Sequence, residues 1–176
     1  MEIKDLRKPL QITDIEFRVQ SINRGGYATI LAYKDARVDM NRLDDVCGAL
    51  NWKREHSKDN ANCIVSIWNE TTNQWVSKED TGVESMAEKE KGKASDSFKR
   101  ACFNWGIGRE LYAYPIISIP LKKDVEWKLV NDRPKQQFGL KIKDWIWFSQ
   151  FNSKGELNYL ACKDDKGNKR FEFGKY

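Results

Sequence analysis

Three side chains near the middle of the chain, Lys99, Arg100 and Phe103, have the types and spacing of a binding surface. On a helix, residues three and four apart are neighbours, so Phe103 can lie beside both cations. Lysine and arginine neutralise phosphates and displace their condensed counterions. An exposed ring can stack on any base, which is worth about 1–3 kcal/mol per base. The pattern alone favours a plainer interpretation, in which both cations are solvated and Phe103 packs under the C-terminal strands.

The segment that carries these residues, Ser85–Tyr112, has the pattern of a helix with one buried face. It opens on a capping box made by Ser85 and Glu88, and it closes at Gly106, a residue type typical of the position after a helix. Its apolar residues recur at three- and four-residue steps and share an arc of about 100°. These residues are Ala94, Phe98, Ala101, Cys102 and Trp105. The cations and Phe103 fall outside this arc, and a phenylalanine exposed between two cations needs a reason.

The composition describes a globular chain with no membrane segment. Hydrophobic residues make up 40% of the 176 residues and charged residues 32%, and no run approaches the ~18 apolar residues of a membrane span. The N-terminus lacks the features of a signal peptide, so we expect a cytoplasmic protein. The net charge of +5 permits nucleic-acid binding without arguing for it. Seven Trp, eight Phe and six Tyr exceed the usual need of such a core, which base stacking or a subunit interface would explain.

No pattern in the sequence indicates an enzyme, so we expect no catalytic residues, no metal and no cofactor. The four cysteines are far apart and His56 is the only histidine, so no zinc-binding spacing occurs. The GIGRE segment at 106–110 lacks the third glycine of a dinucleotide fingerprint and follows a helix. There is no phosphate-binding GxxxxGK[ST] pattern. Cys47 and Cys102 lie on apolar helix faces and are predicted to be buried thiols.

The first two-thirds of the chain predicts hairpins and two helices. Residues 13–22 and 27–33 form a hairpin about the turn Arg24-Gly25-Gly26. Asp35 caps a helix that runs to about Leu50, with Leu50 on its packing face. Further strands are expected at 52–56, 62–69, 74–80 and 116–119.

The composition shifts at Leu121, and no helical period follows. Alternating segments predict five strands, at Trp127–Val130, Phe138–Lys143, Trp145–Phe151, Leu157–Cys162 and Lys169–Phe173. The chain is therefore predicted to be α+β, with residues 1–120 as the main domain and residues 121–176 as a small β-rich appendage.

The segment EKEKGKASDSFKRACFNWGIGRELY resembles the signature of phage-encoded single-strand annealing proteins of the Rad-fifty-two type, sometimes called the Sak group. The resemblance extends upstream in the same order, through the hairpin CIVSIWNETTNQWVSKEDTGVES, the helix ending in GALNW and the first hairpin. It covers about residues 10–120. It implies a β-β-α unit, in which a twisted antiparallel sheet packs on a long central helix.

The resemblance also implies how these residues would act. Subunits of the family assemble into rings or partial rings, whose basic groove holds single-stranded DNA with its bases exposed, and annealing needs no nucleotide or metal. Lys99 and Arg100 match the basic pair that contacts the DNA backbone, and Arg37 is similar to another groove cation in a shifted register. Where this chain has Phe103, eukaryotic members tend to carry a further basic residue. Phe103 would then stack on bases, contact a neighbouring subunit or be buried.

We therefore expect this protein to anneal single-stranded DNA in phage or prophage recombination. It would act independently of ATP, in the cytoplasm of a bacterial host. Its DNA-binding residues would be Lys99, Arg100, Arg37 and Phe103. Its partners would be single-stranded DNA and further copies of the chain, with a phage exonuclease or a host single-strand-binding protein as candidates. The alternative is a single-stranded nucleic-acid-binding or scaffold protein of the same fold that does not anneal.

Overall fold

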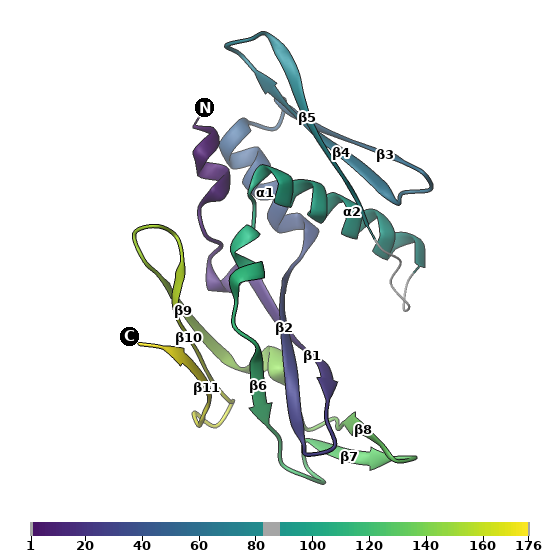
Figure 1. Cartoon of the computed structure of the whole chain (residues 1–176), viewed down its shortest axis with the longest axis vertical. Helices are drawn as coiled ribbons and strands as arrows, with labels where there is room; N and C mark the ends of the chain where they lie inside the picture. The colour runs from purple at the N-terminus through teal and green to yellow at the C-terminus, as the bar shows by residue number, and fades with distance from the viewer. Residues whose placement is uncertain (1, 83–88, 176) are drawn as a thin grey trace. The chain divides into compact units, whose positions relative to one another are not determined.

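The computed structural model describes residues 2–82 and 89–175, and in it the chain is α+β with antiparallel sheets (Figure 1). The chain forms two compact units, each built from two separate segments. Unit 1 comprises Met1–Leu10 and Lys34–Arg109, and unit 2 comprises Gln11–Tyr33 and Glu110–Tyr176. No helix among the described residues combines the length and the apolar character that crossing a membrane requires.

Unit 1 is a three-stranded sheet with helices. Its elements are the 3-10 helix η1 (Ile3–Arg7), α1 (Ala36–Cys47), β3 (Trp52–Ser57), β4 (Asn62–Asn69), β5 (Gln74–Thr81) and α2 (Lys89–Trp105). The antiparallel sheet has the order β3-β4-β5, and α2 packs on β4 and β5. The strands predicted at 52–56, 62–69 and 74–80 are confirmed as β3, β4 and β5, and β4 and β5 form the predicted hairpin.

The helix α1 begins as predicted and ends earlier than predicted. The Asp35 side chain accepts a hydrogen bond from the backbone N–H of Arg37 at 2.8 Å, which is an N-cap. The helix stops at Cys47 because Gly48 takes a left-handed conformation with φ +82°. Leu50 therefore lies beyond the helix and is 92% exposed, so its predicted place on the packing face is wrong.

The helix α2 has the predicted end, and its predicted apolar face is buried except at Ala94, which is partly exposed. Phe98, Ala101 and Cys102 are fully buried, and the Trp105 indole N–H donates to the carbonyl of Val65 at 3.0 Å. Gly106 has φ +104°, which favours glycine. The Gly106 N–H donates to the Phe103 carbonyl, and the Ile107 N–H donates to the Cys102 carbonyl. These two hydrogen bonds form a Schellman motif. The capping box predicted at Ser85 and Glu88 lies outside the described residues.

Unit 2 is built from three small sheets. The first sheet has the order β1-β2-β6 and consists of β1 (Ile15–Ile22), β2 (Tyr27–Lys34) and β6 (Ile117–Pro120). The second is the pair of β7 (Trp127–Val130) and β8 (Arg133–Gln136). The third contains β9 (Ile146–Phe151), β10 (Leu157–Lys163) and β11 (Lys169–Gly174). The 3-10 helices η2 (Ile12–Asp14), η3 (Arg109–Ala113) and η4 (Ile142–Asp144) complete the elements. The predicted hairpin of β1 and β2 is confirmed.

One predicted strand, Phe138–Lys143, is wrong. The Leu140 N–H donates to the Gln137 carbonyl in a turn, and the 3-10 helix η4 follows at Ile142. Leu140 and Ile142 are both buried, so a turn and a short helix reproduce the two-residue alternation of a strand. The strand that pairs with β7 is β8 instead, formed by residues for which the sequence predicts no element.

Candidate nucleic-acid interface

Two of the predicted DNA-binding residues act on one carboxylate, Asp35. Arg37 follows the N-cap of α1, and its Nε donates to Asp35 Oδ1 at 2.9 Å. The hydrogen bonds from Arg37 hold the pKa of Asp35 below its usual value, and the charge of Lys99 on α2 acts in the same direction. The Arg37 side chain is 81% exposed, and Lys99 is half-buried. Asp35 at the N-terminus of α1 is thus paired with Arg37 and also experiences the charge of Lys99.

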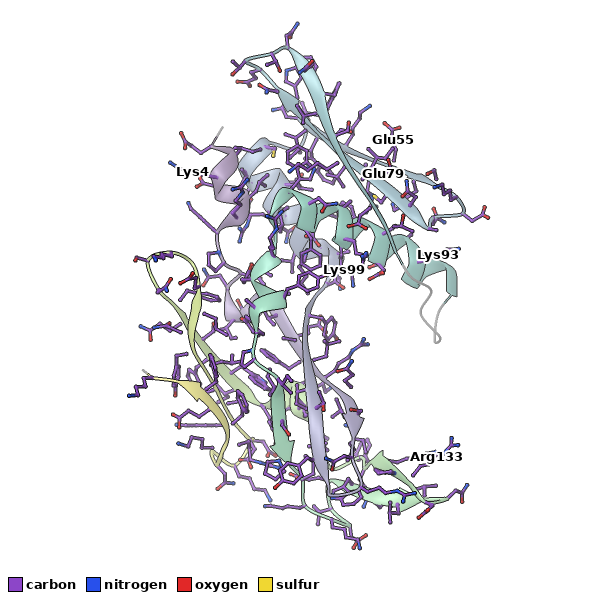
Figure 2. The ribbon with its side chains drawn as sticks, in the orientation of Figure 1. Lys4, Glu55, Glu79, Lys93, Lys99 and Arg133 are labelled. Atoms are coloured by element: carbon purple, nitrogen blue, oxygen red, sulfur yellow. The ribbon has the colours of Figure 1, made fainter. Side chains whose placement is uncertain are left out.

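Arg100 is directed differently from Lys99. Its Nε lies 3.4 Å from Asp80 Oδ1 on β5, and Asn104 Nδ2 donates to Asp80 Oδ2 at 3.3 Å. Lys99 instead lies near α1, on the side of α2 away from the β3-β4-β5 sheet (Figure 2). The adjacent cations that the sequence grouped in one patch therefore have different surroundings, one facing a helix terminus and the other a sheet.

Phe103 lies against a buried cation. The Lys34 Nζ is 4.6 Å from the ring centroid, and Lys34 itself is only 2% exposed and forms an ion pair with Asp39. Burial raises the pKa of Asp39 to about 6, although Lys34 and, more weakly, Lys99 oppose that rise. One face of the half-buried Phe103 ring is therefore covered by an ammonium group, so base stacking on that face would have to displace a buried ion pair.

A second group of cations lies at the C-terminal end of α2, and the sequence interpretation missed it. Lys78 Nζ donates to the Asn104 carbonyl at 2.6 Å, and Arg109 Nη2 donates to the Phe103 carbonyl at 2.7 Å. Burial lowers the pKa of Lys78, and the charges of Arg109 and Arg7 lower it further. Carbonyls at a helix C-terminus lack helical partners and carry partial negative charge. A basic residue just after the predicted helix end was the available signal for Arg109.

The four cysteines and Ser97, the side chains nearest to a nucleophile arrangement among the described residues, are buried. Burial raises the pKa of Cys47 and Cys63 to about 11 and of Cys162 to about 12, so these thiols stay protonated at neutral pH. The predicted burial of Cys47 and Cys102 is confirmed. Ser97 lies 3.4 Å from His56 Nδ1, but it is fully buried and its hydroxyl donates to the Asn60 carbonyl at 2.9 Å. No cluster of acidic, histidine or cysteine side chains suited to a metal ion occurs within the described part of the chain.

The fold and the site define an α+β protein with cations gathered around helix ends. The sequence matches a model of the Rad52/22 family, described as double-strand break repair proteins, over residues 3–129. The chain belongs to this family, which confirms the resemblance to proteins of the Rad-fifty-two type.

A curated relative supports the same assignment. The single-stranded DNA-binding protein DdrA of Deinococcus radiodurans is 30% identical to this chain over 142 residues. The alignment covers 77% of this chain and 65% of DdrA, so the chain spans just under two-thirds of the length of this relative. Residues 130–176, which include β8, η4 and the sheet β9-β10-β11, lie beyond the family match.

Proposed function

We propose that this chain binds single-stranded DNA and promotes annealing of complementary strands in homologous recombination, without ATP. Membership of a double-strand break repair family and similarity to a single-stranded DNA-binding protein support the class of function. The observation that carries the proposal is that Arg37 is hydrogen-bonded to Asp35 at the start of α1, while Lys99 lies on the side of α2 away from the sheet, where its charge also lowers the pKa of Asp35. These two cations come from separate helices; Lys99 matches a groove cation of annealing proteins, and Arg37 is similar to another in a shifted register.

The proposed mechanism is templating rather than bond chemistry. Arg37 and Lys99 would hold phosphates of one strand and release their counterions, while Arg100 would add a contact at the edge of β5. The bases would stay outward, so a complementary strand could sample pairing registers. In this proposal α2 with β3, β4 and β5 is the β-β-α unit of annealing proteins, with α2 as the long central helix.

The decisive experiment removes the proposed backbone contacts. Lys99→Ala with Arg100→Ala should weaken binding to labelled oligothymidylate and lower its salt slope by about one unit for each phosphate that is no longer bound. Lys99→Ala should account for more of this effect, because Asp80 already neutralises part of the Arg100 charge. The matched control is Lys4→Ala with Lys8→Ala, which removes the same charge from exposed side chains of unit 1. Unchanged affinity in the first double variant refutes the site.

The same proteins separate annealing from simple binding. An annealing protein accelerates pairing of complementary oligonucleotides without ATP, whereas a protein that only coats single strands slows it. Acceleration by the wild type, reduced in the Lys99 and Arg100 variant, is the expected result. A slower reaction with the wild type would favour the alternative, a binding or scaffold protein of the same fold.

The biological setting belongs to the same proposal. Annealing proteins of this type act as rings or partial rings, so we propose self-assembly on single-stranded DNA. The setting would be phage or prophage recombination in the cytoplasm of a bacterial host, with a phage exonuclease or a host single-strand-binding protein as partner. Sedimentation with and without single-stranded DNA measures the assembly directly.

A further inference from the structure

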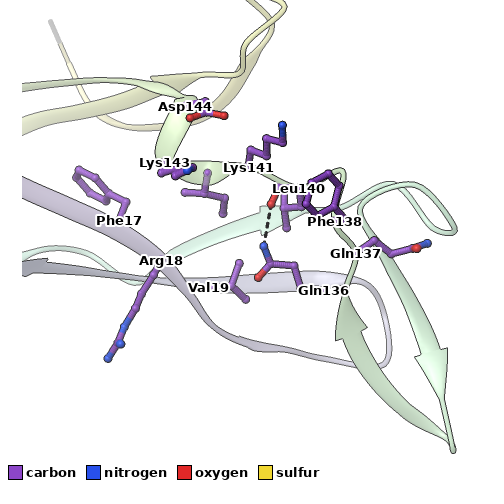
Figure 3. Close-up of a pocket in the computed structure, with 11 residues that line it drawn as sticks. Phe17, Arg18, Val19, Gln136, Gln137, Phe138, Leu140, Lys141, Lys143 and Asp144 are labelled. Atoms are coloured by element: carbon purple, nitrogen blue, oxygen red, sulfur yellow. Dashed lines mark hydrogen bonds between the residues drawn. The ribbon is translucent and has the colours of Figure 1, made fainter. Parts of the chain in front are cut away.

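A groove of about 830 Å³ lies in unit 2 between β1 and the segment 136–144 (Figure 3). Its floor is apolar and includes Phe17, Leu140 and Ile142, all of which are largely buried. Most of its remaining lining is polar and carries amide, ammonium, guanidinium and carboxylate groups. A concave apolar surface with a few polar groups at its edge is the usual form of a ligand site.

The rim of this groove carries Phe138, which at 91% is the most exposed aromatic side chain among the described residues of unit 2. The Lys141 Nζ lies 5.3 Å from the centroid of its ring. A large apolar ring held in water next to a cation is unfavourable in isolation, and such residues commonly mark a binding site. A ring beside a cation suits a ligand that is both planar and anionic.

The charge of the rim is positive. Lys141 and Lys143 have no ion-pair partner among the described residues, and Asp144 is the only carboxylate in the lining. Arg18 also lines the groove, but its guanidinium points away from Phe138 and lies 5.0 Å from the centroid of Tyr33 (Figure 3). The two ammonium groups are therefore the available anion contacts.

The groove is held in place by the packing around it. Phe17 stacks on Trp147 with ring centroids 3.7 Å apart, and Gln136 Nε2 donates to the Leu140 carbonyl at 2.8 Å. A second hollow of about 650 Å³ shares Phe17 and Lys143 and continues along β1 toward Ile12. The lining is thus a preformed track along β1 and can accept an extended ligand.

We propose that this groove is a second contact surface for single-stranded DNA, with a base stacked on Phe138 and phosphates on Lys141 and Lys143. The side-chain amides of Gln136 and Gln137 can meet the polar edge of a base. An acidic peptide would satisfy the lysines but would leave Phe138 without a planar partner. This inference rests on the proposed function and extends it to residues that lie beyond the family match.

The test compares rim variants with matched controls in full-length protein. Phe138→Ala should weaken binding to fluorescein-labelled oligothymidylate about 5- to 150-fold, the effect of one stacked base, and Phe138→Trp should restore it. Leu50→Ala removes an equally exposed apolar side chain of unit 1 and should change nothing. Lys141→Ala with Lys143→Ala should lower the salt slope by about one unit for each phosphate that is no longer bound. Lys128→Ala with Lys135→Ala, a cross-strand pair that does not line the groove, should leave it unchanged.

The outcomes separate this inference from the proposed function. No binding by the wild type overturns both. Binding that depends on Lys99 and Arg100 but not on Phe138, Lys141 or Lys143 overturns the groove alone. Weaker binding in the Phe138 and lysine variants upholds the groove, even where the Lys99 and Arg100 variant still binds. If a glutamate-rich peptide binds the groove and the rim variants fail to bind only that peptide, the ligand is a protein and the inference is wrong.

Discussion

At the scale of single residues, Asp35 performs two tasks that a substitution can separate. It caps α1 through the Arg37 N–H, and it neutralises part of the charge of Arg37 and Lys99. Asparagine is as good an N-cap as aspartate but carries no charge. Asp35→Asn should therefore raise the affinity for single-stranded DNA about two- to fivefold, which corresponds to the ~0.4–1 kcal/mol of an exposed ion pair. Fluorescence anisotropy over a salt series measures this change.

The control for Asp35→Asn is Asp45→Asn, which removes an exposed carboxylate from the other end of α1. It should leave affinity unchanged. A thermal melt of each variant checks that the free energy of unfolding changes by less than about 1 kcal/mol, which is the contribution of one charge near a helix terminus. If affinity falls in Asp35→Asn while the melt is unchanged, Arg37 and Lys99 do not contact phosphate.

The same residues show what a sequence can predict at this scale. The cap at Asp35 and the burial of Phe98 follow from local spacing, and both are confirmed. The contact between Lys34 and the Phe103 ring cannot be predicted from local spacing, because Lys34 is 69 positions away and lysine is rarely buried unless it is paired. Its partner Asp39 lies on α1, so only the folded arrangement brings the three groups together.

At the scale of elements, Arg170 on β11 joins several parts of unit 2. It donates to both carboxylate oxygens of Glu126, at 2.8 and 2.9 Å, and to the carbonyl of Pro120 at the end of β6 at 3.0 Å. Its guanidinium also lies 4.6 Å from the centroid of Trp145. The Arg170 side chain is only 10% exposed and that of Glu126 11%. Such a planar, bidentate contact suits arginine and not lysine.

Replacing Arg170 should therefore destabilise unit 2. Arg170→Met leaves the buried Glu126 without its ion-pair partner, and should lower the free energy of unfolding by about 3 kcal/mol, the low end for a broken buried pair. Arg170→Lys should recover only part of this. The control, Arg24→Met, breaks the exposed pair with Asp132 and should cost less than about 1 kcal/mol. Equal costs in urea denaturation would contradict a structural role for Arg170.

The pH dependence of this variant follows from the two carboxylate partners of Arg170, Glu126 and Asp164, whose pKa values both lie below their usual values. Burial opposes ionisation of Glu126, but hydrogen bonds from Arg170 and the Lys122 amide outweigh it and hold the pKa below its usual 4.5. A carboxylate whose pKa is lowered on folding adds stability above its unfolded pKa and loses it as pH falls through the folded value. The difference between wild type and Arg170→Met should therefore be largest near neutral pH and shrink below about pH 4.5.

At the scale of the whole molecule, the compact units do not follow the order of the chain. The hairpin of β1 and β2 belongs to unit 2 with residues 110–176, although it precedes all of α1 and α2 in sequence. The sequence patterns compare only residues that are close along the chain. They therefore predict a boundary at Leu121, where the composition shifts and after which no helical period occurs. Pairing between β2 and β6 spans about 90 residues, and no local pattern of either strand predicts it. The division into residues 1–120 and 121–176 remains a prediction about function.

A truncation tests that division. The fragment 1–120 keeps all of unit 1. It loses the stacking of Trp147 on Phe17 and the hydrogen bond from Arg170 to the Pro120 carbonyl. We expect β3, β4, β5 and α2 to keep their hydrogen-exchange protection, whereas amides of β1, β2 and β6 lose theirs, because removal of the packed partner exposes Phe17 and Ile119. Trp147→Ala in the full chain should lower protection of β1 in the same direction, which excludes an artefact of the new terminus. Full protection of β1 and β2 in the fragment would instead establish residues 1–120 as a domain that folds without the appendage.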